Sequence, residues 1–418
     1  MSDNAMEAKK AKRIRWRFIA FVYGCSLFYF LFQGGKTAFM LFIILNLLLV
    51  YLMLGRWSGI SKVTGSRTYQ AHGVSPHGPI SSGGALEVQL NVKIPGYFPL
   101  PYVIVRDVLH RHNGQQLSFE TSFVPNWKRS GDVSYRTPPL TRGEYRFRDT
   151  ECLSYDVFGL FEHAGTFRRE AVFSVLPQTV PLRQWNGFQR GIRGPYSHAA
   201  ASRSAKETTQ INGVREYHHG DRLSRVHWNA TAKTGEWKSK AFERESLPRT
   251  LIILDRYAAS SSASADEQFE LAVSAAASFM EHGSRDDTAI GLLSIGERVT
   301  MLPPKSGMEQ RNMVMKHLTF VEADAPQPIY HSLQLADSIV EPGSFALLIS
   351  PDTGSQIIQS MEWLSRKGVT PCLIHIRSAE KISGNVAWKK IVESRGWPVY
   401  EIRQLQELPA ALEGSVIA

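Results

Sequence analysis

The densest group of side chains that could do chemistry lies between Gly213 and Trp228, in the stretch GVREYHHGDRLSRVHW. It contains three histidines, an aspartate, a glutamate, three arginines, a tyrosine and a tryptophan. Histidine titrates close to neutral pH, so it can transfer protons or bind a metal. The same residue types also suit a fixed joint between two domains, and their order has to decide between these roles.

A catalytic site in this stretch would need a general base, for which Asp221 or His227 is suited. Arg215 or Arg225 would stabilise an anion. No nucleophile stands beside them in the order of a catalytic triad. We therefore assign no catalytic residue and keep a membrane-bound enzyme with its site at this stretch as the alternative hypothesis.

A metal site would draw on His218, His219 and His227. Adjacent residues of a strand point to opposite faces, so the first two histidines are badly placed to chelate one ion. No acidic ligand has a partner at the helical i, i+4 spacing. We expect neither a metal nor another cofactor.

A structural role explains the same residues more simply. Gly220 and Asp221 suit a turn, since glycine adopts positive φ and aspartate bonds back to nearby amides. The guanidinium of Arg225 can pair with a carboxylate through two hydrogen bonds. Tyr217 and Trp228 each combine a large apolar ring with one polar group. The stretch therefore predicts a polar seam between two domains.

The net charge of +10 is concentrated near the N-terminus. Residues 1–73 contain ten basic and only two acidic side chains, which leaves the rest of the chain close to neutral. A surface that binds nucleic-acid phosphates needs its basic charge on the folded domains. We therefore expect no nucleic-acid partner.

Two apolar runs, Phe18–Phe32 and Ala38–Leu54, flank a short turn. Their lengths are at the lower end of the ~17–25 residues that cross a bilayer. Basic residues crowd both outer flanks, and the positive-inside rule then places both ends in the cytoplasm. Three widely spaced cysteines agree with a reducing compartment. The sequence predicts a multi-pass protein of the cytoplasmic (inner) membrane, with a basic cytoplasmic N-terminus at 1–17, a transmembrane helical hairpin at 18–54 and cytoplasmic soluble domains.

The rest of the chain divides into two predicted domains and a connection. Short alternating runs such as LEVQLNVKI, separated by turn signals, predict a β-sandwich-like domain at 68–181. A connecting segment at 182–248 holds the histidine-rich stretch, and its piece TAKTGEWKSKAFERES is typical of an exposed or edge strand. From 250 to 418, apolar strands alternate with amphipathic helices, which predicts a doubly wound α/β domain.

The pattern G-V-R-E-Y-x-x-G-D-x-x-x-R-x-H-W-x-x-T-A-K-x-G resembles the signature of the bacterial domain of unknown function numbered fifty-eight. The departures are Val226, Lys233 and Trp237, where the family usually has isoleucine, arginine and leucine. The resemblance extends to two N-terminal spans, a β-rich domain that ends in DVFGLF, and a von Willebrand factor A-like domain. The matching positions are Gly213, Arg215, Tyr217, Gly220, Asp221, Arg225, His227, Trp228, Thr231, Ala232, Gly235 and Lys240.

The likeness to a von Willebrand factor A domain rests on the order of elements and on Asp255, which closes the first strand. That family's metal site uses an Asp-x-Ser-x-Ser loop, whereas this chain has Tyr257 and Ala259 at the serine positions. Arg256 would also repel a cation. Asp255 is thus a degenerate metal-site position.

The family resemblance implies partners rather than a reaction. Its members are typically encoded beside a MoxR-type AAA+ ATPase and often near a transglutaminase-like membrane protein. They are thought to assist the assembly or activation of other complexes. We therefore expect a membrane-tethered cytosolic adaptor or scaffold, recognised by such an ATPase through the von Willebrand A-like domain.

Overall fold

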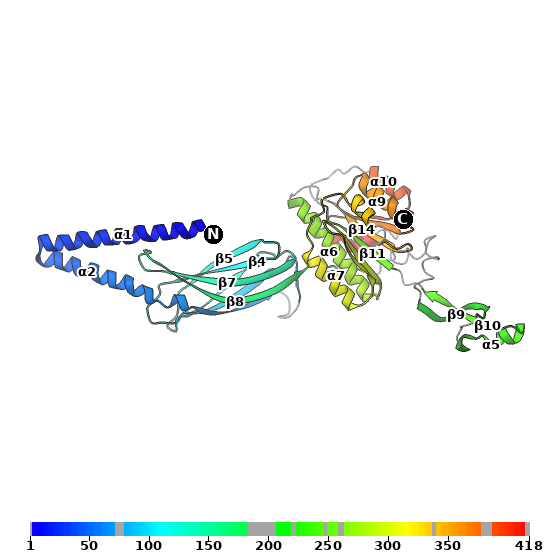
Figure 1. The fold of residues 1–418 in the computed structure, drawn as a ribbon, viewed down its shortest axis with the longest axis horizontal. Coiled ribbons are helices and arrows are strands. Elements are labelled where there is room, and N and C mark those ends of the chain that lie inside the picture. The colour runs from blue at the N-terminus through cyan, green and yellow to red at the C-terminus, as the bar shows by residue number, and fades with distance from the viewer. Residues whose placement is uncertain are drawn as a thin grey trace. The chain divides into compact units, whose positions relative to one another are not determined.

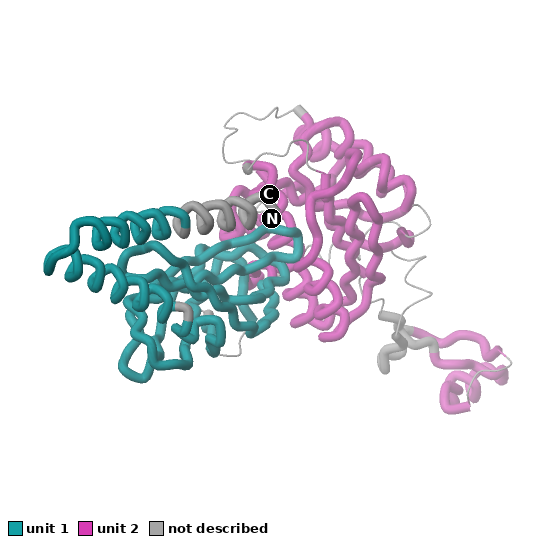
Figure 2. The backbone as a smooth tube through the Cα atoms, turned by 60° about the vertical axis from the view of Figure 1, so that its left-hand side comes forward, with its two compact units in different colours: residues 1–175 teal, residues 176–418 magenta. Residues whose placement is uncertain are grey.

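The computed structural model describes residues 2–71, 79–182, 206–218, 223–245, 249–257, 263–336, 340–377 and 387–413. The chain forms two compact units, residues 1–175 and 176–418 (Figure 2). Each unit has its own arrangement of helices and sheets, and each is described separately below.

The first unit begins with two helices, α1 (Ser2–Gln33) and α2 (Gly35–Leu54), which form a hairpin (Figure 1). Aromatic rings pack across the hairpin, with centroids 5.4 Å apart between Phe30 and Phe42 and 5.8 Å apart between Tyr23 and Phe42. Among the described residues, α2 is the helix long and apolar enough to cross a membrane. The apolar part of α1, Arg17–Gln33, is shorter.

The rest of the first unit is a β-domain of two sheets with strand orders β1-β3-β6 and β2-β8-β7-β4-β5. Strand β3 alternates strictly between buried and exposed residues, so only one of its faces is apolar. Val88 and Leu90 from one sheet and Val105 and Phe147 from the other belong to a single core, as in a β-sandwich. The strands are β1 (Thr64–Ala71), β2 (Ile80–Ser81), β3 (Leu86–Lys93), β4 (Val103–Arg111), β5 (Gln116–Phe123), β6 (Ser130–Arg136), β7 (Gly143–Tyr155) and β8 (Glu162–Leu176).

The second unit contains a six-stranded sheet with the order β13-β12-β11-β14-β15-β16. Its strands run parallel except for β13, which pairs antiparallel at the edge. The expectation of a mainly parallel sheet is therefore confirmed, with one reversed edge strand. The strands are β11 (Arg249–Asp255), β12 (Ala289–Ile295), β13 (Thr300–Lys305), β14 (Phe345–Ser350), β15 (Thr370–Ile376) and β16 (Val399–Ile402).

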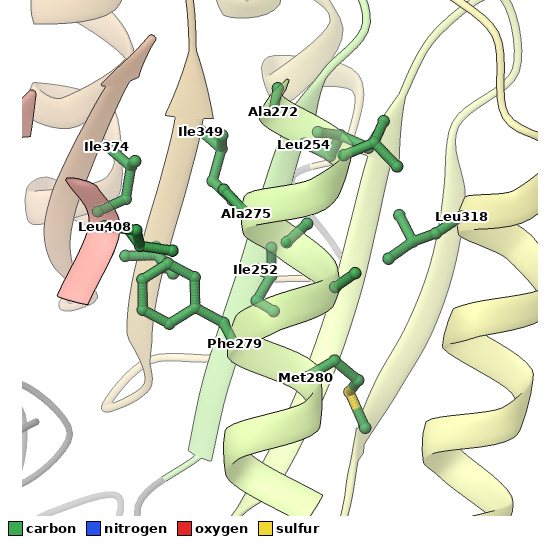
Figure 3. Packing of buried hydrophobic residues seen from close by; sticks show 14 of the residues in the cluster. Ile252, Leu254, Ala272, Ala275, Phe279, Met280, Leu318, Ile349, Ile374 and Leu408 are labelled. Carbon is green, nitrogen blue, oxygen red and sulfur yellow. The ribbon is translucent and has the colours of Figure 1, made fainter. Parts of the chain in front are cut away.

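Helices cover both faces of this sheet because alternate residues of its strands point to opposite sides. On one face, Phe279 of α6 (Ala263–Arg285) packs near Ile252, Ile374 and Leu408 (Figure 3). That face also receives α7 (Met308–Phe320) and α11 (Glu407–Glu413). The other face receives α8 (Ile329–Leu335), α9 (Ser355–Arg366) and α10 (Ala387–Ser394).

The connecting segment forms a small hairpin of its own. Strands β9 (Lys206–Glu216) and β10 (Lys238–Glu245) pair antiparallel, and helix α5 (Trp228–Thr234) lies between them in the chain. The prediction of an exposed strand across TAKTGEWKSKAFERES is thus wrong for its first four residues, which end α5. Gly235 ends this helix with φ of 73°, a conformation that glycine adopts without strain.

Candidate functional site

The histidine-rich stretch contributes most of a structure that we call the signature hairpin, residues 213–218 and 223–240. The strand register pairs Lys238 with Glu216 and Lys240 with Val214. The amide of Tyr217 donates to the carbonyl of Trp237 at 3.0 Å and continues this pairing past the strand end. Gly213 lies in β9 opposite Ala241, with nothing within 4 Å of the place a Cβ would occupy.

His227 is placed at the N-terminus of α5 and caps this helix. Its Nδ1 accepts a hydrogen bond from the amide of Ala230 at 3.2 Å. Its own amide donates to the carbonyl of Lys238 at 2.8 Å, which fixes the residue against β10. An imidazole nitrogen that accepts a capping hydrogen bond is occupied, so this geometry favours a structural role over that of a general base.

Thr231 joins the helix to the next strand. Its Oγ1 accepts a hydrogen bond from the amide of Lys238 at 3.1 Å, while its carbonyl accepts from the amide of Gly235 at 2.9 Å. Beneath these bonds, Val226 and Ser239 are buried and form an isolated bridge. The signature residues in this part of the hairpin therefore fix a turn of helix onto a strand.

Replacing Thr231 by valine should loosen this junction without changing its shape. Losing one hydrogen bond costs about 1 kcal/mol, so the amide of Lys238 should exchange its hydrogen roughly fivefold faster. Residue-resolved hydrogen exchange measures this rate. Thr234→Val is the matched control, since the exposed Thr234 hydroxyl bonds only to the carbonyls of Ala230 and Glu236. Equal rates in the two variants would contradict the role assigned to Thr231.

Three aromatic rings gather on the surface of the signature hairpin. The ring of Trp237 lies 5.5 Å from that of Tyr217 and 5.9 Å from that of Trp228, measured between centroids. Trp228 and Trp237 nevertheless remain 62% and 51% exposed. Large aromatic side chains that hold each other in place and still face solvent are typical of the anchor residues of protein interfaces.

The charged residues of the hairpin form short-range contacts around these rings. Arg215 Nη1 donates to the carbonyl of Glu216 at 3.0 Å and lies 3.2 Å from Nδ1 of His218. The ammonium of Lys238 pairs with Glu216 at 3.7 Å and with Glu236 at 3.3 Å. The carbonyl of Arg225 accepts from Ser239 Oγ at 3.4 Å.

The predicted turn residues Gly220 and Asp221, and His219 of the considered metal set, lie outside the described residues. Among the residues that the structure does describe, no group of three or more His, Cys, Asp or Glu side chains could hold a metal. The bonds described above connect the signature hairpin to itself, so the predicted seam between domains stays a prediction.

The second candidate position, Asp255, lies at the carboxyl end of β11, where parallel sheets bind ligands. Its carboxylate is fully enclosed, with Oδ2 accepting from Ser350 Oγ at 2.6 Å and Oδ1 from the amide of Tyr257 at 3.0 Å. Ser350 in turn accepts from the amide of Asp352 at 3.0 Å. Burial raises the pKa of Asp255 to about 6, against the opposing effect of these hydrogen bonds.

The described residues around Asp255 do not fit a metal ion. Both carboxylate oxygens already accept protein hydrogen bonds, and no second carboxylate shares them. The neighbouring Arg256 is buried and paired with Asp324, with Nε donating to the carbonyl of Glu322 at 2.9 Å. The arrangement instead ties β11 to β14, the two central strands of the sheet.

Replacing Asp255 by asparagine tests this interpretation through its pH dependence. The folded pKa lies above the unfolded value, so the native carboxyl keeps its proton to higher pH, and stability is lost as pH rises through about 6. A neutral asparagine removes that loss. Relative to the wild type, the variant should gain up to roughly 3 kcal/mol in unfolding free energy between about pH 4 and 7. Denaturant unfolding of the α/β domain at several pH values measures this, and a constant difference would contradict it.

Two residues of these sites, Trp237 and Ser350, were not predicted from the sequence. Trp237 stood out only as a departure from the family pattern, yet its ring is the centre of the aromatic group. Ser350 follows a buried apolar run, and its link to Asp255 spans 95 residues of chain. The polar ending Ser350-Pro351-Asp352 of that run was the available signal, since strand ends of a parallel sheet lie side by side.

Comparison with protein families places the signature in a wider unit. Residues 213–356 match the family "Protein of unknown function DUF58". The match begins at the first signature residue and ends in α9, so it joins the signature hairpin to the first four strands of the α/β sheet. A curated relative, the uncharacterized protein YeaD of Bacillus subtilis (strain 168), is 25% identical over 337 residues, which cover 75% of this chain and 79% of YeaD.

Solved structures resemble the chain only distantly. Proximal thread matrix protein 1 of the mussel byssus is 12% identical, with a TM-score of 0.29, and the match covers 41% of this chain and 46% of that one. The CARDB domain of the PF1109 protein from Pyrococcus furiosus is 18% identical over 27% of this chain and 89% of its own, with a TM-score of 0.17. The chain therefore spans less than half of the mussel protein, and neither likeness carries an argument about fold or function.

Proposed function

We propose that the chain is a membrane-tethered cytosolic adaptor that works with a MoxR-type AAA+ ATPase in the assembly or activation of another complex. The helical hairpin is the tether and crosses the cytoplasmic membrane twice, with both ends in the cytoplasm. The signature hairpin and the α/β domain, which share the family match, form the part that the ATPase binds. A transglutaminase-like membrane protein is a second proposed partner.

The observation that carries this proposal is that, within the signature hairpin, the histidine has a structural role while two tryptophans remain exposed. His227, one of the two residues considered as a general base, caps α5 through its Nδ1. The two tryptophans beside it are held in place but stay more than half exposed. This combination supports a binding surface over the alternative of a membrane-bound enzyme.

The α/β domain supports the same proposal. Its strand order places β11 at the centre with β12 and β13 on one side and β14 to β16 on the other, and only the edge strand β13 is antiparallel. We assign this order to a von Willebrand A-like domain. Because the carboxylate of Asp255 is enclosed and already hydrogen-bonded, we propose that the domain binds its partner through surface contacts and not through a bridging metal ion.

Capture from membranes tests the proposal. The tagged full-length protein is solubilised from its native membrane and purified with ATP, with a non-hydrolysable ATP analogue, or without nucleotide. Retention of an AAA+ ATPase of the MoxR type with the analogue, and its loss without nucleotide, is the expected result. A fragment that ends before Gly59, and so contains only the tether, is the control for capture by the tether alone. Absence of the ATPase in all three conditions would contradict the adaptor role.

A further inference from the structure

One end of the β-domain exposes a set of large aromatic side chains. Tyr97 and Trp127 are fully exposed, at 103% and 104%, and Trp57 and Phe158 are 76% and 58% exposed. Single exposed apolar residues are ordinary on a protein surface, but a group of them marks an interaction site. We call these four residues the aromatic collar.

The strand register puts three members of the collar, Tyr97, Trp127 and Phe158, at the same end of the domain. Lys93, which ends β3, pairs with Ser130, which begins β6, so the loops that carry Tyr97 and Trp127 leave from one edge. The loop with Phe158 joins β7 to β8 at the pair Tyr155 and Glu162.

Hydrogen bonds connect these loops to each other and to the chain that follows α2. The guanidinium of Arg129 donates to the carbonyls of Ile94, Phe98 and Ser58. Within the five-stranded sheet, Ser154 Oγ of β7 donates to the carbonyl of Tyr102, just before β4, at 2.8 Å. The loops and the end of the span therefore form one connected structure.

The last turn of α2 lies directly against this structure. The ring of Tyr51 is 5.6 Å from that of Phe98 and 6.4 Å from that of Phe158, measured between centroids. A Cβ on Gly59 would come within 1.7 Å of the carbonyl oxygen of Pro95, and one on Gly165 within 1.8 Å of that of Ile60. The segment between α2 and the β-domain is therefore closely packed, and this packing keeps the β-domain at the end of the helix.

We propose that the aromatic collar lies in the lipid headgroup region of the membrane that α2 crosses, so that the β-domain rests on the bilayer. This inference depends on the membrane tether of the proposed function. Helix α2 stays apolar up to Leu54, so the bilayer surface lies within a few residues of Trp57, at ~1.5 Å of rise per residue. Aromatic rings favour this zone, where an apolar body and a polar edge are both solvated.

The position of the collar favours lipid, and not a protein, as its binding partner. Phe158 contacts the final turn of the span through Tyr51, so it lies at the depth where the apolar segment ends. A protein that covered the collar would have to displace the lipid that surrounds this turn. The collar therefore has its binding partner as soon as the helix is inserted.

The test uses an environment-sensitive fluorophore on single cysteines in the full-length protein. Cys25 is replaced by serine, while Cys152 and Cys372 are buried and stay unlabelled. The label is placed at Trp127→Cys and, independently, at Tyr97→Cys. Asn113→Cys is the matched control, because this exposed turn residue lies at the opposite end of the same domain, beyond the pair His110 and Gln116.

Each labelled protein is inserted into nanodiscs of phosphatidylcholine and phosphatidylglycerol that carry a nitroxide near the headgroup. We expect blue-shifted, quenched emission for the labels at 127 and 97, and unquenched emission for the label at 113. A further label at Leu47→Cys, exposed on α2, reports insertion through a mid-chain nitroxide. Quenching at 47 without quenching at 127 and 97 would overturn the collar while the tether stands. No quenching at 47 would overturn the tether itself, and the collar with it.

Discussion

Replacing Asp107 by alanine is expected to lower the unfolding free energy of the β-domain by about 3–5 kcal/mol. Asp107 lies in the core and binds the guanidinium of Arg67 through both oxygens, at 2.6 Å and 3.2 Å. The hydroxyls of Tyr135 and Thr150 donate to the same carboxylate at 2.6 Å and 3.2 Å. Alanine would leave a buried arginine without its counter-charge, and that loss is the source of the effect.

The surroundings of Tyr135 and Arg67 suit their roles as donors to Asp107. Burial first, and then the negative charge of Asp107, raise the pKa of Tyr135 above its ordinary value, so its phenol stays a donor. The guanidinium of Arg67 also lies 4.3 Å from the centre of the Phe147 ring, which favours a cation there.

Hydrogen exchange of the amides of β3 and β4 in the solubilised full-length protein measures the effect for this domain alone. Glu120→Ala is the control, because Glu120 pairs with Arg106 at 2.8 Å where both side chains are about half exposed. An exposed pair contributes up to about 1 kcal/mol. Equal destabilisation by the two variants would show that the buried group does not hold the two sheets together.

Replacing Gly59 by alanine is expected to destabilise the packing of the β-domain against the end of α2 by roughly 2–5 kcal/mol. Gly59 has φ of 77°, which costs a residue with a Cβ, and that Cβ would also collide with the carbonyl oxygen of Pro95. The protection of the amides of residues 60–63 against hydrogen exchange, measured in nanodiscs, reports on this packing.

Gly83→Ala separates the two causes. Gly83 has a similar φ of 86°, but nothing lies within 4 Å of its Cβ position. Its substitution should therefore cost only the backbone term, about 1–2 kcal/mol. If Gly59→Ala costs no more than Gly83→Ala, the linker has room at Pro95 and the rigid connection is wrong.

Elements with a strong apolar pattern could be predicted from the sequence. The continuous apolar strands of the α/β sheet and the alternation in β3 follow directly from burial on two faces or one. The two apolar runs are helical, as α1 and α2, although α1 extends over the whole basic N-terminal segment. In each case a local pattern carries the information.

Elements whose stability comes from distant partners could not be predicted. β1 starts at Thr64, before the predicted boundary at 68, because its polar sequence TGSRTYQA becomes a strand only by pairing with β3. Helix α5 is short and depends on the His227 cap and on the bond from Lys238 to Thr231. The contact between Arg67 and Asp107 joins residues 40 positions apart, and no local spacing indicates it.

The candidate site divides in the same way. Composition alone identified the stretch from Gly213 to Trp228, and the apolar run that Asp255 closes identified this aspartate as a strand end. The capping role of His227 and the exposure of the tryptophans required the pairing of β9 with β10. The pairing between strands thus determines which polar residues stabilise the hairpin and which side chains stay exposed.

The decisive measurement is the affinity of a MoxR-type AAA+ ATPase, the proposed partner, for this protein with and without the exposed tryptophans of the signature hairpin. The wild type and Trp228→Ala/Trp237→Ala are compared in nanodiscs with the non-hydrolysable ATP analogue, with Trp127→Ala as a matched loss of an exposed tryptophan elsewhere. We expect the double variant to bind about 30-fold more weakly or worse, because tryptophan anchors contribute 2 kcal/mol or more, and we expect Trp127→Ala to bind as the wild type does. Unchanged affinity in the double variant, with the Lys238 amide still protected, would contradict the claim that the signature hairpin is the binding surface.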